Sequence, residues 1–91
     1  MAQSTLYRVT FKPTAQRELR KLDPPVIKRI LQKIERLKRN PRPPGVKKLQ
    51  DIPGGYRLRV GDWRILYTVD DPAREVHVYR IKHRREAYRR S

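Results

Sequence analysis

The stretch from Gly55 to Tyr67, GYRLRVGDWRILY, places the tightest constraint on how this chain can fold. Two β-type runs flank Gly61-Asp62, and glycine at the first of two central residues is what a type II′ hairpin turn requires. With a turn this short, Val60 faces Trp63 across the two strands, and every other pair follows by counting. The sequence therefore predicts a β-hairpin whose register is set by its turn.

This register divides the hairpin into an apolar face and a basic face, because side chains alternate along a strand. The apolar face carries Tyr56, Leu58, Val60, Trp63, Ile65 and Tyr67. The other face carries Arg57, Arg59 and Arg64. Like charges directly opposite each other on a sheet are destabilising, so a pair of strands that tolerates them suggests a surface for an anion. A solvated outer face that is merely rich in arginine is the alternative interpretation.

Composition and charge narrow the class of protein. A chain of 91 residues is expected to form one domain over residues 1–91. It has no cysteine, which excludes disulfides and thiolate metal sites and fits a cytoplasmic location. Lys and Arg total 24 against 9 acidic residues, a net charge of +15, with twice as many arginines as lysines. We therefore expect a polyanionic partner, either nucleic acid or a very acidic protein, and no membrane.

The rest of the chain predicts a β-α-α-β-β-β order. Alternation predicts a first strand over residues 5–11, with Tyr7, Val9 and Phe11 facing inward. The other expected elements are helices over 13–22 and 24–39, the hairpin strands, a strand over 75–81 and a short terminal helix within 83–90. Pro13 suits a first helical turn, and Asp23 suits an N-cap. Residues 46–49 are expected to add a short edge strand.

The sheet order follows from which strands are free to pair. The strand over 75–81 is apolar on both faces, as expected for a central strand, and the first strand is the only neighbour available for its free side. The order is then first, last, middle, second. The sequence predicts an α+β, two-layer fold with a twisted, mostly antiparallel sheet. Both helices cover its apolar face, and the arginine face stays open.

The residues available for chemistry are guanidinium groups and a phenol. His77 and His83 have no carboxylate at ligand spacing, so no metal site and no cofactor are expected. Arginines can bind a phosphate and stabilise the charge that develops on its oxygens. RNA supplies its own nucleophile, the 2′-hydroxyl beside the phosphate, and cleavage in this way leaves a 2′,3′-cyclic phosphate and a 5′-hydroxyl.

Four stretches carry a family resemblance that covers nearly the whole chain: residues 7–19, Asn40-Pro41, residues 55–67 and residues 81–88. In these stretches the chain resembles a RelE-type toxin of the RelE/ParE superfamily, the toxic half of a type II toxin–antitoxin pair. The resemblance implies a ribosome-dependent endonuclease that cuts mRNA in the A site beside ribosomal RNA. It also implies restraint by an acidic or mixed-charge antitoxin, with operator DNA contacted only through that antitoxin.

The same resemblance implies roles for single residues. Arg64 matches the phosphate-stabilising arginine, Arg84 matches a second arginine after the last strand, and Tyr88 matches a tyrosine that stacks on or orients a base. Arg57 and Arg59 fall where the best-studied member has two lysines, and an arginine essentially cannot lose its proton. The general base therefore stays open between His83 and Tyr88.

Both candidate bases have structural alternatives, a surface position for His83 and packing of the terminal helix for Tyr88. The further residues expected to contact RNA are Lys47, Lys48, Lys82, His83 and Arg85.

Two other functions remain open. One is a ParE-like protein that poisons a topoisomerase without cutting RNA, and the other is a nucleic-acid-binding member of the fold with weakened catalysis. The combination of Arg64, Arg84 and Tyr88 favours cleavage over the first. The lack of an exposed aromatic set on the arginine face argues against the second.

Overall fold

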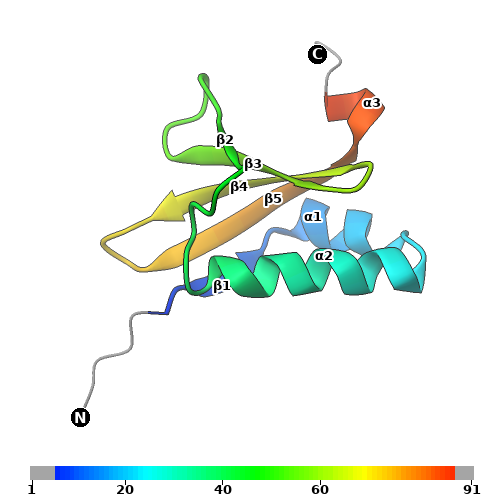
Figure 1. Ribbon diagram of the computed structural model, residues 1–91, viewed down its shortest axis with the longest axis horizontal. Coiled ribbons are helices and arrows are strands. Elements are labelled where there is room, and N and C mark those ends of the chain that lie inside the picture. Colours follow the sequence, from blue (N-terminus) through cyan, green and yellow to red (C-terminus); the bar gives the residue numbers. More distant parts are fainter. Residues whose placement is uncertain (1–5, 88–91) are drawn as a thin grey trace.

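A computed structural model describes residues 6–87 and contains three helices and five strands in that range (Figure 1). In chain order they are β1 (Arg8–Phe11), α1 (Pro13–Arg20), α2 (Pro24–Leu37), β2 (Lys47–Lys48), β3 (Gly55–Val60), β4 (Trp63–Asp70), β5 (Glu75–His83) and α3 (Arg84–Ala87).

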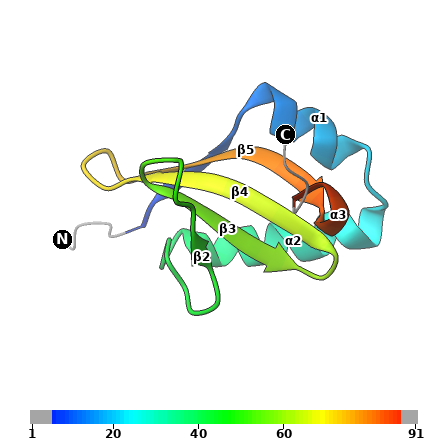
Figure 2. The same cartoon turned by 90° about the horizontal axis from the view of Figure 1, so that it is seen from above.

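The five strands form one sheet in the order β1-β5-β4-β3-β2, seen from above in Figure 2. β1 runs parallel to β5, and the other three neighbouring pairs are antiparallel. The predicted α+β fold and its strand order are confirmed. The predicted edge strand is present but shorter, because only Lys47 and Lys48 pair with β3.

The hairpin has the register that its turn predicts. Val60 lies opposite Trp63, and the pairing continues without a slip to Tyr56 opposite Tyr67. Gly61 has φ +59°, a value that side chains other than glycine rarely adopt. The turn glycine therefore fixes which hairpin residues face the core.

Both long helices begin at proline and end slightly earlier than the sequence predicts. α1 starts at Pro13 and ends at Arg20, and α2 starts at Pro24 and ends at Leu37. Asp23 occupies the N-cap position with extended backbone, but its side chain makes no capping hydrogen bond. Asp23 therefore occupies the N-cap position without capping the helix. Pro24, whose ring fixes φ near the helical value, favours the start of α2.

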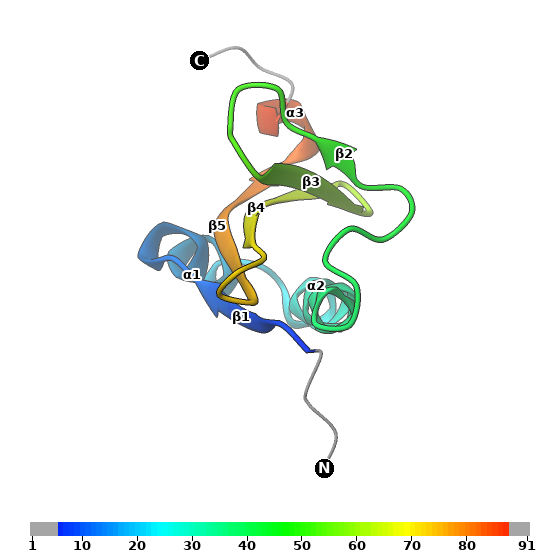
Figure 3. The same cartoon turned by 90° about the vertical axis from the view of Figure 1, so that its left-hand side faces the viewer.

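The core lies between these two helices and one face of the sheet (Figure 3). Its buried members are Ala15, Ile30, Ile34 and Leu37 from the helices and Leu58, Val60, Ile65, Tyr67, Val76, Val78 and Ile81 from the sheet. Tyr7, Val9 and Phe11 pack against this cluster, which confirms their inward orientation. α3 lies on the other side of the sheet, beyond the hairpin turn (Figure 1).

β5 contains a bulge that the sequence does not reveal. Leu66 lies opposite Arg80, but the next residue, Tyr67, lies opposite Val78, so Tyr79 has no partner in β4. The extra residue reverses the alternation of side chains beyond it. As a result, Ile81 faces the core together with Val78, although three positions separate them.

We expect Gly61→Ala to lower the free energy of unfolding by about 1–2 kcal/mol, because an L-residue is strained at this φ. A Cβ at this position would also lie 3.3 Å from Arg29 Nη1. Urea unfolding measures the change, and Asp62→Gly in the same turn is the control that should cost less. An unchanged midpoint for Gly61→Ala would mean that the turn does not depend on glycine.

Candidate functional site

The carbonyl groups of the hairpin turn hold two arginine side chains of the basic face. Arg64 Nη1 donates to the carbonyl oxygens of Gly61 and Trp63, both at 3.1 Å. Arg59 Nε donates to the carbonyl oxygen of Gly61 at 3.4 Å. Arg59 and Arg64 are also opposite each other in the sheet. The backbone of the turn therefore orients the guanidinium groups that the strands bring together.

Arg64 is buried, with only 4% of its surface exposed. This corrects the expectation of an open arginine face, since Arg59 is exposed, Arg57 is half-buried and Arg64 lies beneath the surface. A buried guanidinium group must be hydrogen-bonded, and the carbonyl oxygens of the turn meet part of that need. The face is thus basic but not uniformly solvated.

A small pocket of about 170 Å³ lies on this face. Its lining residues are Gly45, Lys47, Arg57, Arg59 and Arg64. Four of these carry a positive charge, and the pocket volume is several times the ~30 Å³ share of one water molecule. Such a pocket suits an anionic group of phosphate size, because one guanidinium group can donate two parallel hydrogen bonds to two phosphate oxygens.

Arg84 reaches the same turn from the C-terminal side. Its backbone N–H donates to the carbonyl oxygen of Asp62 at 2.7 Å, and its Nη1 lies 3.7 Å from Asp62 Oδ1. Arg64 and Arg84 are therefore anchored on adjacent residues of one turn, but Arg84 does not line the pocket. Tyr88, the fifth residue predicted for catalysis, lies outside the described residues.

The residues predicted to contact RNA are dispersed around this pocket. Lys47 lines it, and Lys82 lies opposite Arg64 in the sheet, on the same face. Lys48 and Arg85 are exposed, but neither lines the pocket. The structure thus places Lys47 in the pocket and Lys82 opposite Arg64, whereas Lys48 and Arg85 are not part of the pocket lining.

His83 lies on the opposite face from Arg64. It pairs with Trp63 in the sheet, and the two rings meet edge to face with centroids 5.1 Å apart. Its Nδ1 accepts a hydrogen bond from the backbone N–H of Arg85 at 3.3 Å. Because neighbouring residues of a strand point to opposite faces, this placement argues against His83 as the base for chemistry at Arg64.

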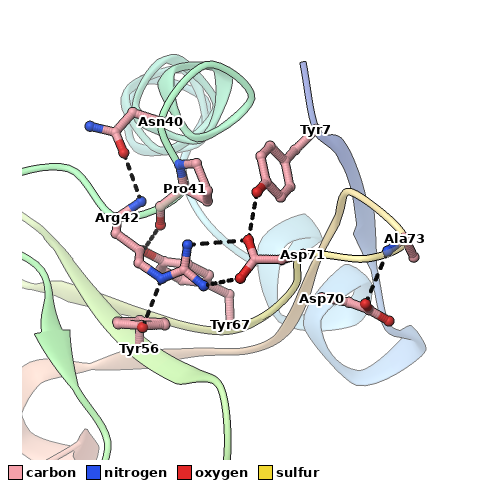
Figure 4. Close-up of polar contacts among 9 residues, drawn as sticks. All are labelled: Tyr7, Asn40, Pro41, Arg42, Tyr56, Tyr67, Asp70, Asp71 and Ala73. Carbon is pink, nitrogen blue, oxygen red and sulfur yellow. Dashed lines mark hydrogen bonds and ion pairs between the residues drawn. The ribbon is translucent and has the colours of Figure 1, made fainter. Parts of the chain in front are cut away.

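A polar network at the other end of the sheet was missed by the sequence reasoning (Figure 4). Arg42 Nη2 and Nη1 donate to the two carboxylate oxygens of Asp71 at 2.7 and 3.3 Å. Arg42 Nε donates to the Tyr56 hydroxyl at 2.8 Å, and the Tyr7 hydroxyl donates to Asp71 Oδ1 at 2.5 Å. We call these four residues the clasp.

The sequence offered little signal for the clasp. Arg42 stands between two prolines, a context typical of a stiff loop, and Asp71 precedes Pro72, a context typical of a turn. The two are 29 positions apart, so no local spacing connects them. The paired guanidinium group lowers the pKa of Asp71, with a smaller contribution from the Tyr7 hydroxyl, and the carboxylate in turn raises the pKa of Tyr7.

Two structural features are absent from residues 6–87. No group of three or more His, Asp or Glu side chains in this range is arranged to hold a metal ion. None of the helices in the same range is long and apolar enough to cross a membrane.

Comparison with known proteins places this geometry in a family. Residues 9–88 match the family described as the ParE toxin of the type II toxin–antitoxin system parDE. Toxin RelG of Mycobacterium tuberculosis is 34% identical over 85 residues, which cover 92% of this chain and 98% of RelG. The chain belongs to the RelE/ParE superfamily of type II toxins.

Solved structures of RelE-type toxins have the same fold. The RelE–RelB complex of Pyrococcus horikoshii superposes with a TM-score of 0.79 at 27% identity, covering 87% of this chain and 96% of that one. The isolated RelE toxin of E. coli gives a TM-score of 0.76 at 26% identity, covering 93% and 87%. The chain is therefore a toxin with the RelE-like fold, and its relatives include toxins solved with their antitoxin.

We expect Asp71→Asn to lower stability at neutral pH, with the difference from the parent chain disappearing in acid. The folded-state pKa of Asp71 is depressed, so its carboxylate stabilises the fold above the unfolded-state pKa, about 4. This contribution is lost as the pH falls through the lower, folded-state value. Urea unfolding of both chains between pH 7 and pH 2 measures it, and a difference that is constant with pH would contradict it.

Proposed function

We propose that this toxin is an endoribonuclease that cuts mRNA in the ribosomal A site without a metal ion. The observation that carries the proposal is the buried guanidinium group of Arg64, oriented by the turn carbonyls in a pocket with Arg57, Arg59 and Lys47. Donors fixed before the reaction stabilise developing charge without reorganising, which is how an enzyme gains most from electrostatics.

The proposed reaction uses the substrate's own hydroxyl group. The pocket holds the scissile phosphate, and the adjacent 2′-hydroxyl oxygen attacks phosphorus in line with the departing 5′-oxygen. The 2′-hydroxyl loses its proton, the P–O5′ bond breaks, and the 5′-oxygen takes up a proton. Arg64, Arg59 and Arg57 neutralise the charge that accumulates on the phosphate oxygens. The products are a 2′,3′-cyclic phosphate and a 5′-hydroxyl.

Residues around the pocket would extend the contact with RNA. Arg84 is 56% exposed on the side of the same turn, and Tyr88 follows it by four positions in the sequence. We assign Arg84 to the phosphate and Tyr88 to a neighbouring base. Lys47, Lys48, Lys82 and Arg85 would contact mRNA or ribosomal RNA backbone, which gives salt-dependent affinity without sequence choice.

We expect Arg64→Ala to lower the rate of mRNA cleavage by about 10²–10³-fold, as for the loss of one donor to a transition-state oxyanion. Arg64→Lys should also be impaired, because an ammonium group cannot reproduce the two-pronged geometry. The measurement is the mapping of 5′ ends in ribosome-programmed mRNA, with growth arrest on induction as a second reading.

Arg36→Ala is the matched control, since it removes an exposed arginine of α2 and the same charge. Its cleavage should equal that of the parent chain. Full cleavage by a folded Arg64→Ala chain would remove Arg64 from the site, and absence of cleavage by the parent chain would remove the proposed activity.

A second candidate is favoured by the description of the matching family, which is named for ParE toxins. In that case the chain would poison a topoisomerase and leave RNA intact. Growth arrest with unchanged RNA ends, together with inhibition of DNA supercoiling in vitro, would support this candidate. Topoisomerase poisoning would not require the arginine-lined pocket.

The partner proposed for this chain is a cognate antitoxin, as in the RelE–RelB complexes among its structural relatives. An acidic or mixed-charge segment would lie over the basic face or the helices. A depression of about 540 Å³ on the outer side of α2 could bind apolar side chains of this segment, because Ile27 and Leu31 line it. Leu31 is 42% exposed. Contact of the toxin with operator DNA would be only through this antitoxin.

We expect the antitoxin to raise the melting midpoint of the toxin, because it neutralises part of the +15 charge and binds only the folded chain. At 100 times its Kd, a ligand of this kind stabilises by about 2.7 kcal/mol, which for a domain of this size corresponds to about 10 °C or more. Calorimetry of the free chain and of the complex measures the shift. Equal midpoints would contradict the proposal.

A further inference from the structure

The segment of residues 41–46, which precedes β2, contributes Gly45 to the wall of the basic pocket and has only weak backbone hydrogen bonding of its own. Gly45 lines the pocket, and Lys47 lines it directly after this segment. Within the segment, the backbone hydrogen bond from Val46 to the Pro43 carbonyl is long, at 3.3 Å. β2 then pairs with β3 through two residues only. This wall therefore needs support from outside the segment.

The clasp supplies that support at the start of the segment. Arg42 binds both carboxylate oxygens of Asp71, a geometry that fixes the orientation of the guanidinium plane. The same guanidinium group donates to the Tyr56 hydroxyl and lies 5.4 Å from the centroid of the Tyr56 ring. Tyr7 in turn holds Asp71 from the residue before β1. The segment is thus tied to the β4–β5 turn and to β3.

A second bond fixes the residue before Arg42. The buried hydroxyl group of Tyr67 donates to the Pro41 carbonyl oxygen at 2.7 Å. Tyr67 belongs to the core, so this bond fixes the position of the backbone where the segment leaves α2. The side chain of Arg42 anchors the next residue of the chain through its bonds to Asp71 and Tyr56.

We propose that Asp71 and Arg42 are positioning residues, which hold the Gly45–Lys47 wall so that Lys47 converges with the arginines on one anion. Tyr56, the contact of Arg42 in β3, directly precedes Arg57 and pairs with Lys48 of β2. The clasp therefore acts on both strands that border the pocket. Its use in catalysis rests on the proposed function, whereas its hold on the wall is a property of the fold.

Electrostatics and positioning predict opposite changes in RNA affinity for the Asp71→Asn variant, so the direction of the change tests the proposal. Asp71→Asn removes a negative charge, so long-range electrostatics alone predicts tighter binding of RNA. Positioning predicts weaker binding, because the wall loses its anchor. Arg42→Lys keeps the net charge but cannot bind a carboxylate in the two-pronged manner, and it should weaken binding as well.

The first measurement is hydrogen exchange of backbone amides in the purified chain, which reports how often the hydrogen bonds of the pocket wall open. The amides to follow are those of Val46 and Leu49, which donate to Pro43 and Gly55 at the two ends of β2. We expect exchange at both to be about three- to fivefold faster in Asp71→Asn and Arg42→Lys, the factor for loss of one favourable exposed ion pair. Unchanged exchange in both variants would overturn the proposal.

The matched control is Glu35→Gln on α2, which removes the same charge from an exposed ion pair with Lys38 at 3.3 Å. This pair does not contact the 41–46 segment through any of the bonds described above. Its variant should leave exchange at Val46 and Leu49 unchanged. Equally fast exchange in Glu35→Gln would show a general loss of stability and would also overturn the proposal.

The second measurement reads the pocket, by fluorescence anisotropy with a short 2′-O-methyl RNA oligonucleotide that cannot be cleaved. We expect Asp71→Asn and Arg42→Lys to bind it about three- to fivefold more weakly than the parent chain, and Glu35→Gln to bind it at least as well. Equal or tighter binding by Asp71→Asn would overturn the positioning role while leaving the proposed function intact. Faster exchange in the two variants, with no cleavage of ribosome-programmed mRNA by the parent chain, would uphold the clasp and overturn the proposed function.

Discussion

The positive φ of Gly61 is the constraint on which the rest of the structure depends. It allows a two-residue turn, and this turn sets a register that places Leu58, Val60, Ile65 and Tyr67 of the hairpin in the core, on the side of the helices. The same turn presents its carbonyl oxygens to Arg59 and Arg64 and anchors Arg84 through Asp62. One backbone conformation therefore organises both the core and the basic pocket.

The burial of Arg64 shows how a chain with a large positive charge can hold guanidinium groups close together. Repulsion between Arg59 and Arg64, which face each other, is offset by bonds to the Gly61 carbonyl oxygen, which accepts from both side chains. A guanidinium group held in this way has little freedom to lose when an anion binds. The fold thus orients these guanidinium groups before an anion binds.

Two acidic residues of this basic chain, Glu18 and Asp71, connect segments that are far apart in the sequence. Glu18 of α1 accepts from the Ile81 backbone N–H at 2.7 Å, on the edge of β5 beyond the last residue paired with β1, and also binds Arg80. Asp71 holds Arg42 at the opposite end of the sheet. These two carboxylates therefore stabilise an edge of the sheet and a connecting segment.

The sequence by itself determined the element order, the hairpin register and the strand order, because glycine at the turn and alternating side chains are local signals that few folds satisfy. It also placed Arg57, Arg59 and Arg64 on one face, since a face follows from counting along a strand. Tertiary structure alone decided the bulge at Tyr79, the burial of Arg64, the separation of His83 from the pocket and the pairing of Arg42 with Asp71. These features depend on which distant segments pack together, and the spacing of residues along the chain does not indicate that packing.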